Sequence, residues 1–186
     1  MLIPKTNVGD SKKGDYMLIR LNKFLSSDQI SLKIDKNFTI DDEAFLSDTH
    51  LHKNINFKGE AFKVDGSILL NGIIKYTFSD QCARCLTHFD NTIETEFKAV
   101  LSDCPKENEK DNESDEIQLK ITDGCIDPEE DIKQMIYLSM PMKSLCKPDC
   151  KGICPNCGVN LNYEECKCKD NLIDPRFEKL KDLLND

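Results

Sequence analysis

The sequence predicts an α+β protein, in which a curved antiparallel β-sheet or partial barrel carries few helices and a C-terminal appendage. Three observations predict this class. Apolar and polar residues alternate over much of the first 102 residues, helical spacing of apolar residues replaces the alternation after residue 127, and six cysteines crowd together near the end. The chain therefore divides into a β-rich domain at 1–102, an acidic flexible loop at 103–126, and a part at 127–186 that holds a helix, the cysteine cluster and a last helix.

Half-buried antiparallel strands account for the alternation, because successive side chains of a strand point to opposite faces of a sheet. Apolar residues occupy every second position at 30–34, 68–78 and 93–101, and Gly72 interrupts the second of these segments. Two further strands are predicted at 17–21 and 57–64. Residues 25–29 are expected to form a loop or a single helical turn.

Two short amphipathic helices are predicted, one on each side of the cysteine cluster. Asp127 and Pro128 form a typical helix start, apolar residues follow at helical spacing, and Pro141 ends the run. Asp174 and Pro175 repeat this start near the end of the chain, and an apolar stripe follows them.

The negative charge of the chain lies in one segment. Residues 103–131 carry a net charge of −9, which equals the formal charge of the whole protein. Residues 106–116 include no apolar side chain, so they cannot bury surface to offset their conformational entropy. We interpret this stretch as a solvated loop; an acidic arm that imitates nucleic acid or contacts a basic protein is the alternative.

Composition argues against several classes of protein. No run of about 18 apolar residues is present, which argues against a transmembrane helix. Residues 1–10 lack the basic stretch and apolar run of a secretory signal, and the cysteines are unevenly grouped, so we expect no disulfide framework. The acidic balance argues against general electrostatic coating of nucleic acid.

Six cysteines between residues 146 and 168 predict a metal site, because thiols at this density are either oxidised or bound to metal. The stretch Cys154-Pro155-Asn156-Cys157-Gly158 has the spacing of a zinc knuckle, in which two thiolates grip one ion from a tight turn. No histidine lies in this segment, and no ligand position is left for water. The zinc is therefore expected to be structural and to fold a segment that has few apolar residues of its own.

One tetrahedral zinc takes four of the six cysteines. The spacing favours Cys154, Cys157, Cys166 and Cys168, with Cys146 and Cys150 as alternate ligands. A zinc shared between the knuckle pair and the distant Cys82 and Cys85 is the main competitor. The spacing gives no support to a two-zinc cluster with bridging thiolates. Five lysines surround the cluster and would offset the charge of a zinc tetrathiolate: Lys143, Lys147, Lys151, Lys167 and Lys169.

A second cysteine motif, Cys82-Ala83-Arg84-Cys85, lies between two predicted strands. Its spacing fits half a metal site, a redox pair or a hairpin corner. A thioredoxin-like redox motif follows a strand and opens a helix, whereas strands flank this motif on both sides, which disfavours redox catalysis. Arg84 is expected to position the turn or to contact a phosphate, with the first role favoured.

Four stretches carry a resemblance to a known family: CARCL from Cys82, LSMPMKSLC from Leu138, CKGICPNCGVNLN from Cys150 and DPRFEKL from Asp174. Together they resemble the YceD family, the large ribosomal RNA subunit accumulation proteins, over about residues 18–184. The resemblance implies a cytoplasmic bacterial protein without known catalytic activity, associated with accumulation or processing of large-subunit ribosomal RNA. It also implies that the two cysteine motifs need not share one metal, since some members carry the C-x-R-C-L turn alone.

We therefore expect a noncatalytic factor for large ribosomal subunit biogenesis with a structural zinc site; a thiol redox protein that uses Cys82 and Cys85 is the alternative. The expected partner is a precursor of large-subunit ribosomal RNA or a ribosomal protein. Neither a membrane nor a small-molecule substrate is expected. The five lysines around the cysteine cluster are the candidate RNA contacts, because a zinc knuckle with basic residues can bind RNA.

Overall fold

The structure is a computed structural model that describes residues 17–103 and 117–168. The chain forms two compact units, Met1–Asp80 with Phe89–Met142, and Gln81–His88 with Lys143–Asp186. The predicted helix that begins at Asp174, the fifth lysine Lys169 and most of the acidic stretch lie outside the described residues.

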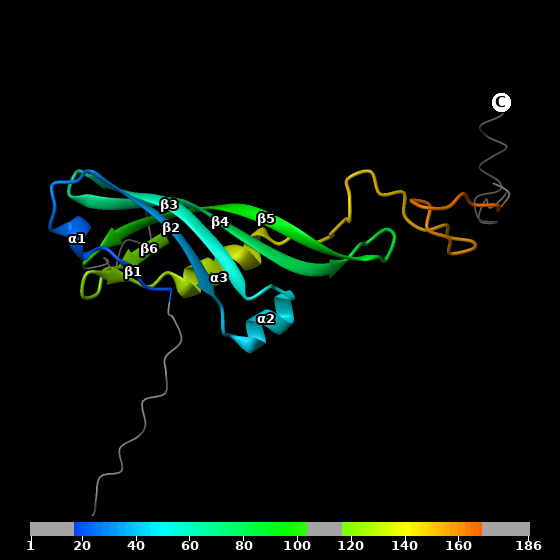
Figure 1. The fold of residues 1–186 in the computed structure, drawn as a ribbon, viewed down its shortest axis with the longest axis horizontal. Coiled ribbons are helices and arrows are strands. Elements are labelled where there is room, and N and C mark those ends of the chain that lie inside the picture. Colours follow the sequence, from blue (N-terminus) through cyan, green and yellow to red (C-terminus); the bar gives the residue numbers. More distant parts are fainter. Residues whose placement is uncertain (1–16, 104–116, 169–186) are drawn as a thin grey trace, which may run out of the picture. The chain divides into compact units, whose positions relative to one another are not determined.

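The first unit is built on a five-stranded sheet with the strand order β2-β3-β4-β5-β6. Antiparallel pairing joins β2 to β3 and β3 to β4, whereas β6 runs parallel to β5. A separate ribbon pairs β1 with β7. The strands are β1 (Ile19–Arg20), β2 (Ser31–Thr39), β3 (Asn54–Val64), β4 (Ser67–Gln81), β5 (His88–Ser102), β6 (Ile117–Lys120) and β7 (Cys125–Ile126). The α+β prediction is confirmed, and within the described residues the sheet stays open and does not close into a barrel (Figure 1).

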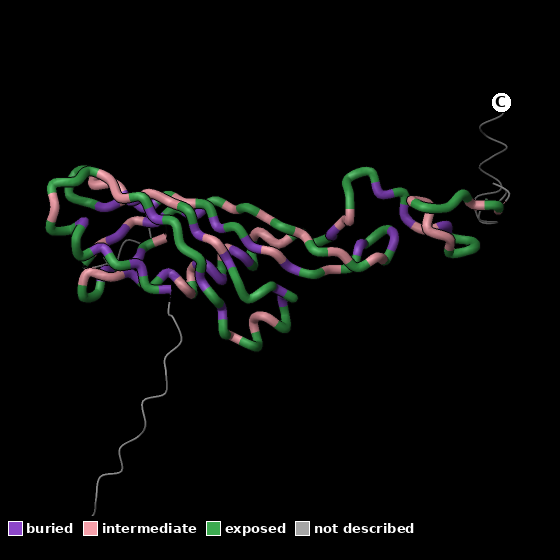
Figure 2. The backbone as a smooth tube through the Cα atoms, in the orientation of Figure 1, coloured by how far each residue is buried: buried purple, intermediate pink, exposed green. Residues whose placement is uncertain are grey.

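The core of the first unit lies between one face of the sheet and helix α3 (Glu129–Ser139). Buried and exposed positions alternate along the strands, as half-buried antiparallel strands require (Figure 2). The rings of Phe57 and Phe97 pack edge to face with centroids 5.8 Å apart. The hydroxyl of Tyr76 lies 2.8 Å from Ser139 Oγ, so a fully buried strand residue fixes the end of α3.

Gly72 has a packing role in β4. It lies directly opposite Gly59 of β3, and a Cβ atom at Gly72 would come within 2.6 Å of the ring atom Cζ of Phe57. The two facing glycines therefore make room for the Phe57 ring, which is why an apolar strand is interrupted at this point.

The helices differ in part from the sequence prediction. Helix α3 begins one residue later than predicted, with Pro128 at its N-cap, although the carboxylate of Asp127 still accepts a 3.2 Å hydrogen bond from Glu129 N. Helix α1 (Asn22–Leu25) is a single turn. Helix α2 (Glu43–Thr49) was not predicted, because it spans only two turns and its apolar residues Phe45 and Leu46 are only partly buried.

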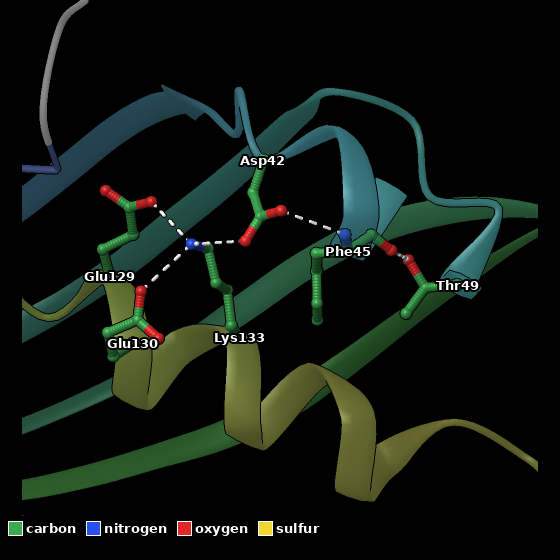
Figure 3. A network of polar contacts seen from close by, with 6 residues as sticks. All are labelled: Asp42, Phe45, Thr49, Glu129, Glu130 and Lys133. Carbon is green, nitrogen blue, oxygen red and sulfur yellow. Dashed lines mark hydrogen bonds and ion pairs between the residues drawn. The ribbon is translucent and has the colours of Figure 1, made fainter. Parts of the chain in front are cut away.

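A buried lysine joins α2 to α3. The Nζ atom of Lys133 lies 2.8 Å from Glu129, 3.1 Å from Glu130 and 3.3 Å from Asp42 (Figure 3). Asp42 is also the N-cap of α2, since its other oxygen accepts a 3.1 Å hydrogen bond from Phe45 N. One ammonium group therefore holds the starts of two helices together.

The structure draws the internal boundaries differently from the predicted division at 1–102, 103–126 and 127–186. Strands β6 and β7 lie inside the segment that was expected to be a loop, because Leu119 and Ile126 are buried in the core. Helix α3 belongs with the sheet, since Ile132 and Ile136 are buried against it. The turn that connects β4 to β5 instead belongs with the cysteine segment.

Candidate metal centres

The second unit contains two groups of four cysteines, and within each group the sulfur atoms all lie within 4.8 Å of one another. The first group is Cys82, Cys85, Cys146 and Cys150, and the second is Cys154, Cys157, Cys166 and Cys168. All cysteines in the described part of the chain carry free thiols. Each group could hold one metal ion.

The first group joins the β4–β5 turn to the segment that begins at Lys143. Within the turn, Cys82 N donates to Thr87 O at 2.9 Å and Leu86 N donates to Cys82 O at 2.9 Å. The turn is tied to the later segment by Ala83 N, which donates to Ser144 O at 2.9 Å. The resulting sulfur contacts are 3.7 Å between Cys82 and Cys150 and 3.6 Å between Cys85 and Cys146.

Arg84 supports this first group from the side. Its Nη1 atom donates a 2.9 Å hydrogen bond to the carbonyl oxygen of Cys150. Gly152 lies against the same turn with a φ of +77°, and a Cβ atom there would come within 3.1 Å of Arg84 O. Arg84 therefore connects the turn to the segment that carries Cys150.

The second group is closed by the predicted knuckle. Gly158 N donates to Cys154 O at 2.9 Å, Cys154 N donates to Val159 O at 2.8 Å, and Gly158 adopts a φ of +74°. Cys166 approaches from the far end of the following loop, with its sulfur 3.3 Å from Cys154 Sγ and 3.7 Å from Cys157 Sγ. This group is more open to solvent than the first, since Cys157 is exposed.

Backbone N–H groups favour the thiolates of Cys82 and Cys154, and the hydroxyl and N–H of Thr87 lower the pKa of Cys85. Burial raises the pKa of the Cys82 thiol, but N–H groups of Cys146, Cys85 and Arg84 outweigh it and lower that pKa to about 6. In the second group, the N–H groups of Cys157 and Asn156 lower the pKa of Cys154 to about 6.

The neighbouring thiols show the opposite shift. Burial and contacts with the other sulfurs of its group raise the pKa of Cys146 to about 12. The N–H of Cys168 favours the thiolate of Cys166, but the contact with Cys154 and burial outweigh it and raise the pKa of Cys166 to about 12. Four thiolates so close together repel one another, so a fully ionised group requires a cation at its centre.

The structure brings together the four sulfurs that the spacing favoured, Cys154, Cys157, Cys166 and Cys168. The expected alternates Cys146 and Cys150 lie instead with Cys82 and Cys85, so the competing set that joined Cys82 and Cys85 to the knuckle pair is not assembled. Sequence spacing could not predict this arrangement, because residues 89–142 of the first unit lie between the two halves of the first group in the sequence. Cys125 lies in β7, outside both groups.

Two polar residues that sequence reasoning did not single out touch sulfur atoms of the first group, and a third contacts one of these two. Thr87 Oγ1 lies 3.4 Å from Cys85 Sγ, and Asn162 Nδ2 lies 3.3 Å from Cys150 Sγ. Asn160 Nδ2 donates to Thr87 Oγ1 at 3.4 Å. The signal was present in the sequence, since both asparagines belong to the stretch CGVNLN that follows the knuckle.

A family model described as "Large ribosomal RNA subunit accumulation protein YceD" matches residues 70–184, which is more than half of the chain and includes all eight cysteines of the two groups. The chain belongs to the YceD family. The name of this family associates it with accumulation of large-subunit ribosomal RNA.

Curated relatives are similar over part of their length. An uncharacterised protein of Mycobacterium tuberculosis is 31% identical over 65% of this chain, and an uncharacterised protein of Mycobacterium leprae is 28% identical over 70% of it. The match spans only 58% of the length of each of these relatives. A chloroplast protein of Zea mays, named large ribosomal RNA subunit accumulation protein YCED homolog 1, is 28% identical over 56% of this chain and 45% of its own length.

No solved structure shows a significant match to this chain. Among the described residues, no helix has the length and apolar character needed to cross a membrane.

Proposed function

We propose that this member of the YceD family is a noncatalytic factor in large ribosomal subunit biogenesis, and that two structural zinc ions hold its second unit together. The observation that carries the zinc proposal is the all-sulfur composition of two separate groups of four cysteines. Four thiolates without an open position are typical of structural zinc sites and leave no place for a reactive water.

The sulfur contacts fit zinc in size. Tetrahedral zinc with Zn–S bonds of about 2.3 Å holds its sulfurs about 3.8 Å apart. The contacts of the first group, 3.7 and 3.6 Å, and the 3.7 Å contact between Cys157 and Cys166 lie close to this spacing, whereas the 3.3 Å contact between Cys154 and Cys166 is shorter. Disulfide sulfurs, by contrast, lie about 2.05 Å apart.

The burial of the first group supports ligation over redox chemistry. Cys82 is fully buried and Cys85 is 5% exposed, so neither sulfur is open to a protein or small-molecule disulfide. The sulfur of Cys82 lies 3.7 Å from that of Cys150, which is a further ligand and not a substrate.

The surface of the second unit supports contact with RNA. Its four described lysines, Lys143, Lys147, Lys151 and Lys167, are exposed, and none makes an ion pair with another described residue. Tyr163 is 78% exposed, and an exposed aromatic ring is a stacking platform for an unpaired base. We propose that these side chains contact unpaired nucleotides of a large-subunit ribosomal RNA precursor.

The net charge of this unit sets a condition on that contact. The side chains of its described part carry five positive and three negative charges, and each zinc tetrathiolate would add two negative charges. Attraction to phosphate must therefore come from individual lysines at the surface and falls steeply with salt.

Ultraviolet crosslinking in growing cells, with the crosslinked RNA sequenced, tests the proposal. The full chain is expected to crosslink to large-subunit ribosomal RNA. A variant in which the four described lysines are changed to Glu and Tyr163 is changed to Ala should lose most of the crosslinks. The matched control changes four exposed lysines of the first unit to Glu: Lys23, Lys33, Lys53 and Lys120.

Three outcomes would count against the proposal. Equal loss in both variants would show a nonspecific charge effect. Crosslinks to ribosomal proteins without crosslinks to RNA would assign the contact to a protein. Unchanged levels of large-subunit ribosomal RNA after depletion of the protein would remove it from subunit biogenesis.

A further inference from the structure

We infer that the two metal groups are coupled, and that Asn162 is the positioning residue that transmits the coupling by donating a hydrogen bond to the Cys150 sulfur. This inference rests on the metal binding proposed above, but not on any contact with RNA. It follows from the position of Asn162 in the chain and from the bonds of its side chain.

Asn162 belongs to the loop that the second group closes. The loop lies between Cys157 and Cys166, whose sulfurs approach to 3.7 Å. Its backbone folds back along the preceding segment, where Leu161 N donates to Gly152 O at 2.9 Å and Ile153 forms a bridge with Asn160. A metal ion at the second group would fix both ends of this loop.

The loop nevertheless reaches the first group. Asn162 Nδ2 donates to Cys150 Sγ at 3.3 Å, and Asn162 Oδ1 accepts a 3.0 Å hydrogen bond from Lys151 N. The orientation of the amide is therefore determined on both sides, with its donor aimed at the sulfur. A sulfur that carries the charge of a thiolate gains more from this donor than a neutral thiol does.

A second path runs beside the first. Asn160 Oδ1 accepts from Asn162 N at 3.0 Å and from Asn162 Nδ2 at 2.9 Å, while Asn160 Nδ2 donates to Thr87 Oγ1. Thr87 in turn touches the sulfur of Cys85. The loop of the second group therefore contacts one ligand of the first group directly, Cys150, and holds Thr87, the partner of another ligand, Cys85.

Two consequences follow for metal binding. Outer partners that orient a ligand typically contribute 10–100-fold to metal affinity, so loss of the Asn162 bond should weaken the first group by about that factor. Because the bond requires an ordered loop, an empty second group should weaken the first group as well. By linkage, metal at the first group should strengthen the second group by the same factor.

Zinc affinity of the full chain, measured by competition with a coloured chelator, tests the inference through three changes. Asn162→Leu should lower the affinity of the first group 10–100-fold while two zinc ions still bind at saturation. Cys157→Ser with Cys166→Ser should empty the second group and lower the affinity of the first group to a similar degree. Adding Asn162→Leu to that double variant should then change little, because the two changes break the same link.

Asn162→Asp separates a hydrogen-bond role from a packing role. Aspartate keeps the shape of asparagine and can still accept from Lys151 N, so Asn162→Asp changes only the group that faces Cys150 Sγ. A carboxylate oxygen beside a thiolate is repulsive, so the coupling predicts a larger loss for Asn162→Asp than for Asn162→Leu. Asn71→Leu is the matched control, since it makes the same substitution at an exposed residue of the first unit.

The inference is overturned if Asn162→Leu leaves the zinc affinity of the first group unchanged, or if Asn162→Asp lowers that affinity less than Asn162→Leu does. Additive losses from Asn162→Leu and the emptied second group would also overturn it. So would a first group that binds no zinc in any variant. None of these outcomes depends on RNA, so they are distinct from a failure of the crosslinking experiment.

Discussion

Arg84 Nη1 and the carbonyl oxygen of Cys150 lie 2.9 Å apart and form a hydrogen bond across 66 residues of sequence. This bond connects the turn that carries Cys82 and Cys85 to the segment that carries Cys146 and Cys150. The turn and the segment are thus held together by protein contacts as well as by any metal.

Replacing Arg84 should accelerate metal loss from the first group. Arg84→Leu removes the donor to Cys150 O, and we expect zinc to leave the first group roughly tenfold faster, as for loss of other outer partners. The measurement is the rate of zinc transfer to an excess of chelator. The kinetic phase that is missing in Cys82→Ser is assigned to the first group. Lys147→Leu serves as the control, and equal rates in the two variants would rule out this role for Arg84.

Two glycines with similar backbone angles should respond differently to alanine. Gly152 and Gly158 have φ values of +77° and +74°, so both substitutions carry a conformational cost of about 1 kcal/mol. Only at Gly152 would the new Cβ also meet a neighbour, Arg84 O at 3.1 Å, whereas nothing lies within 4 Å at Gly158. Gly152→Ala should therefore weaken zinc retention more than Gly158→Ala, and the reverse order in a chelator assay would contradict this placement.

Removing metal should unfold the second unit and spare the first. The first unit has its own core, in which Phe57, Leu70 and Ile74 are fully buried. In small zinc modules such as the second unit, by contrast, metal binding supplies on the order of 10 kcal/mol of folding free energy. Hydrogen exchange with mass spectrometry, before and after chelation, should show lost protection at 143–168 and retained protection in β3 and β4. Loss of protection in both units, or in neither, would contradict the prediction that metal folds the second unit alone.

Replacing the buried Lys133 should destabilise the first unit. Lys133→Met leaves the carboxylates of Asp42, Glu129 and Glu130 without their common cation, and we expect a loss of about 2 kcal/mol in urea unfolding because these acids are partly exposed. Lys75→Met is the control, since the Lys75–Glu94 pair is exposed on both sides and should contribute less than about 1 kcal/mol. Equal losses in the two variants would contradict the structural role of Lys133.

The pH dependence of this loss follows from the two shifted groups. The N–H of Phe45 and then Lys133 lower the pKa of Asp42, so its contribution is present above the unfolded pKa of about 3.9 and disappears as the pH falls through the folded value. Burial lowers the pKa of Lys133, but its three carboxylates outweigh burial and raise that pKa. Its contribution is therefore complete below about pH 10.4 and is lost as the pH rises through the folded value.

The difference in unfolding free energy between wild type and Lys133→Met should be constant from about pH 5 to 9 and shrink below about pH 4. A difference that grows in acid would contradict this account.

The parts of the fold that could be predicted have strong local signals. Alternation located β2, β4 and β5, and the Asp127-Pro128 start with the Pro141 stop located α3 to within one residue. Helix α2 and strands β6 and β7 escaped prediction because each is short. Their place depends on contacts with distant residues, such as Lys133 on Asp42 and Ile126 opposite Ile19.

The two metal groups also differ in how far the sequence alone predicts them. The second group comes from one stretch of chain, so the spacing of its knuckle and the later pair Cys166 and Cys168 sufficed to propose it. The first group is assembled only when β4 and β5 bring the Cys82–Cys85 turn to the segment after α3, and no local pattern carries that information.

Native mass spectrometry of the full chain, purified under reducing conditions, tests the presence of two tetrathiolate metal centres most directly. We expect a mass increase of two zinc ions per chain, falling to one in Cys82→Ser and in Cys157→Ser, and to none in the variant with both changes. A chain without zinc, a chain with a single zinc that both variants retain, or a mass that shows paired disulfides would contradict it.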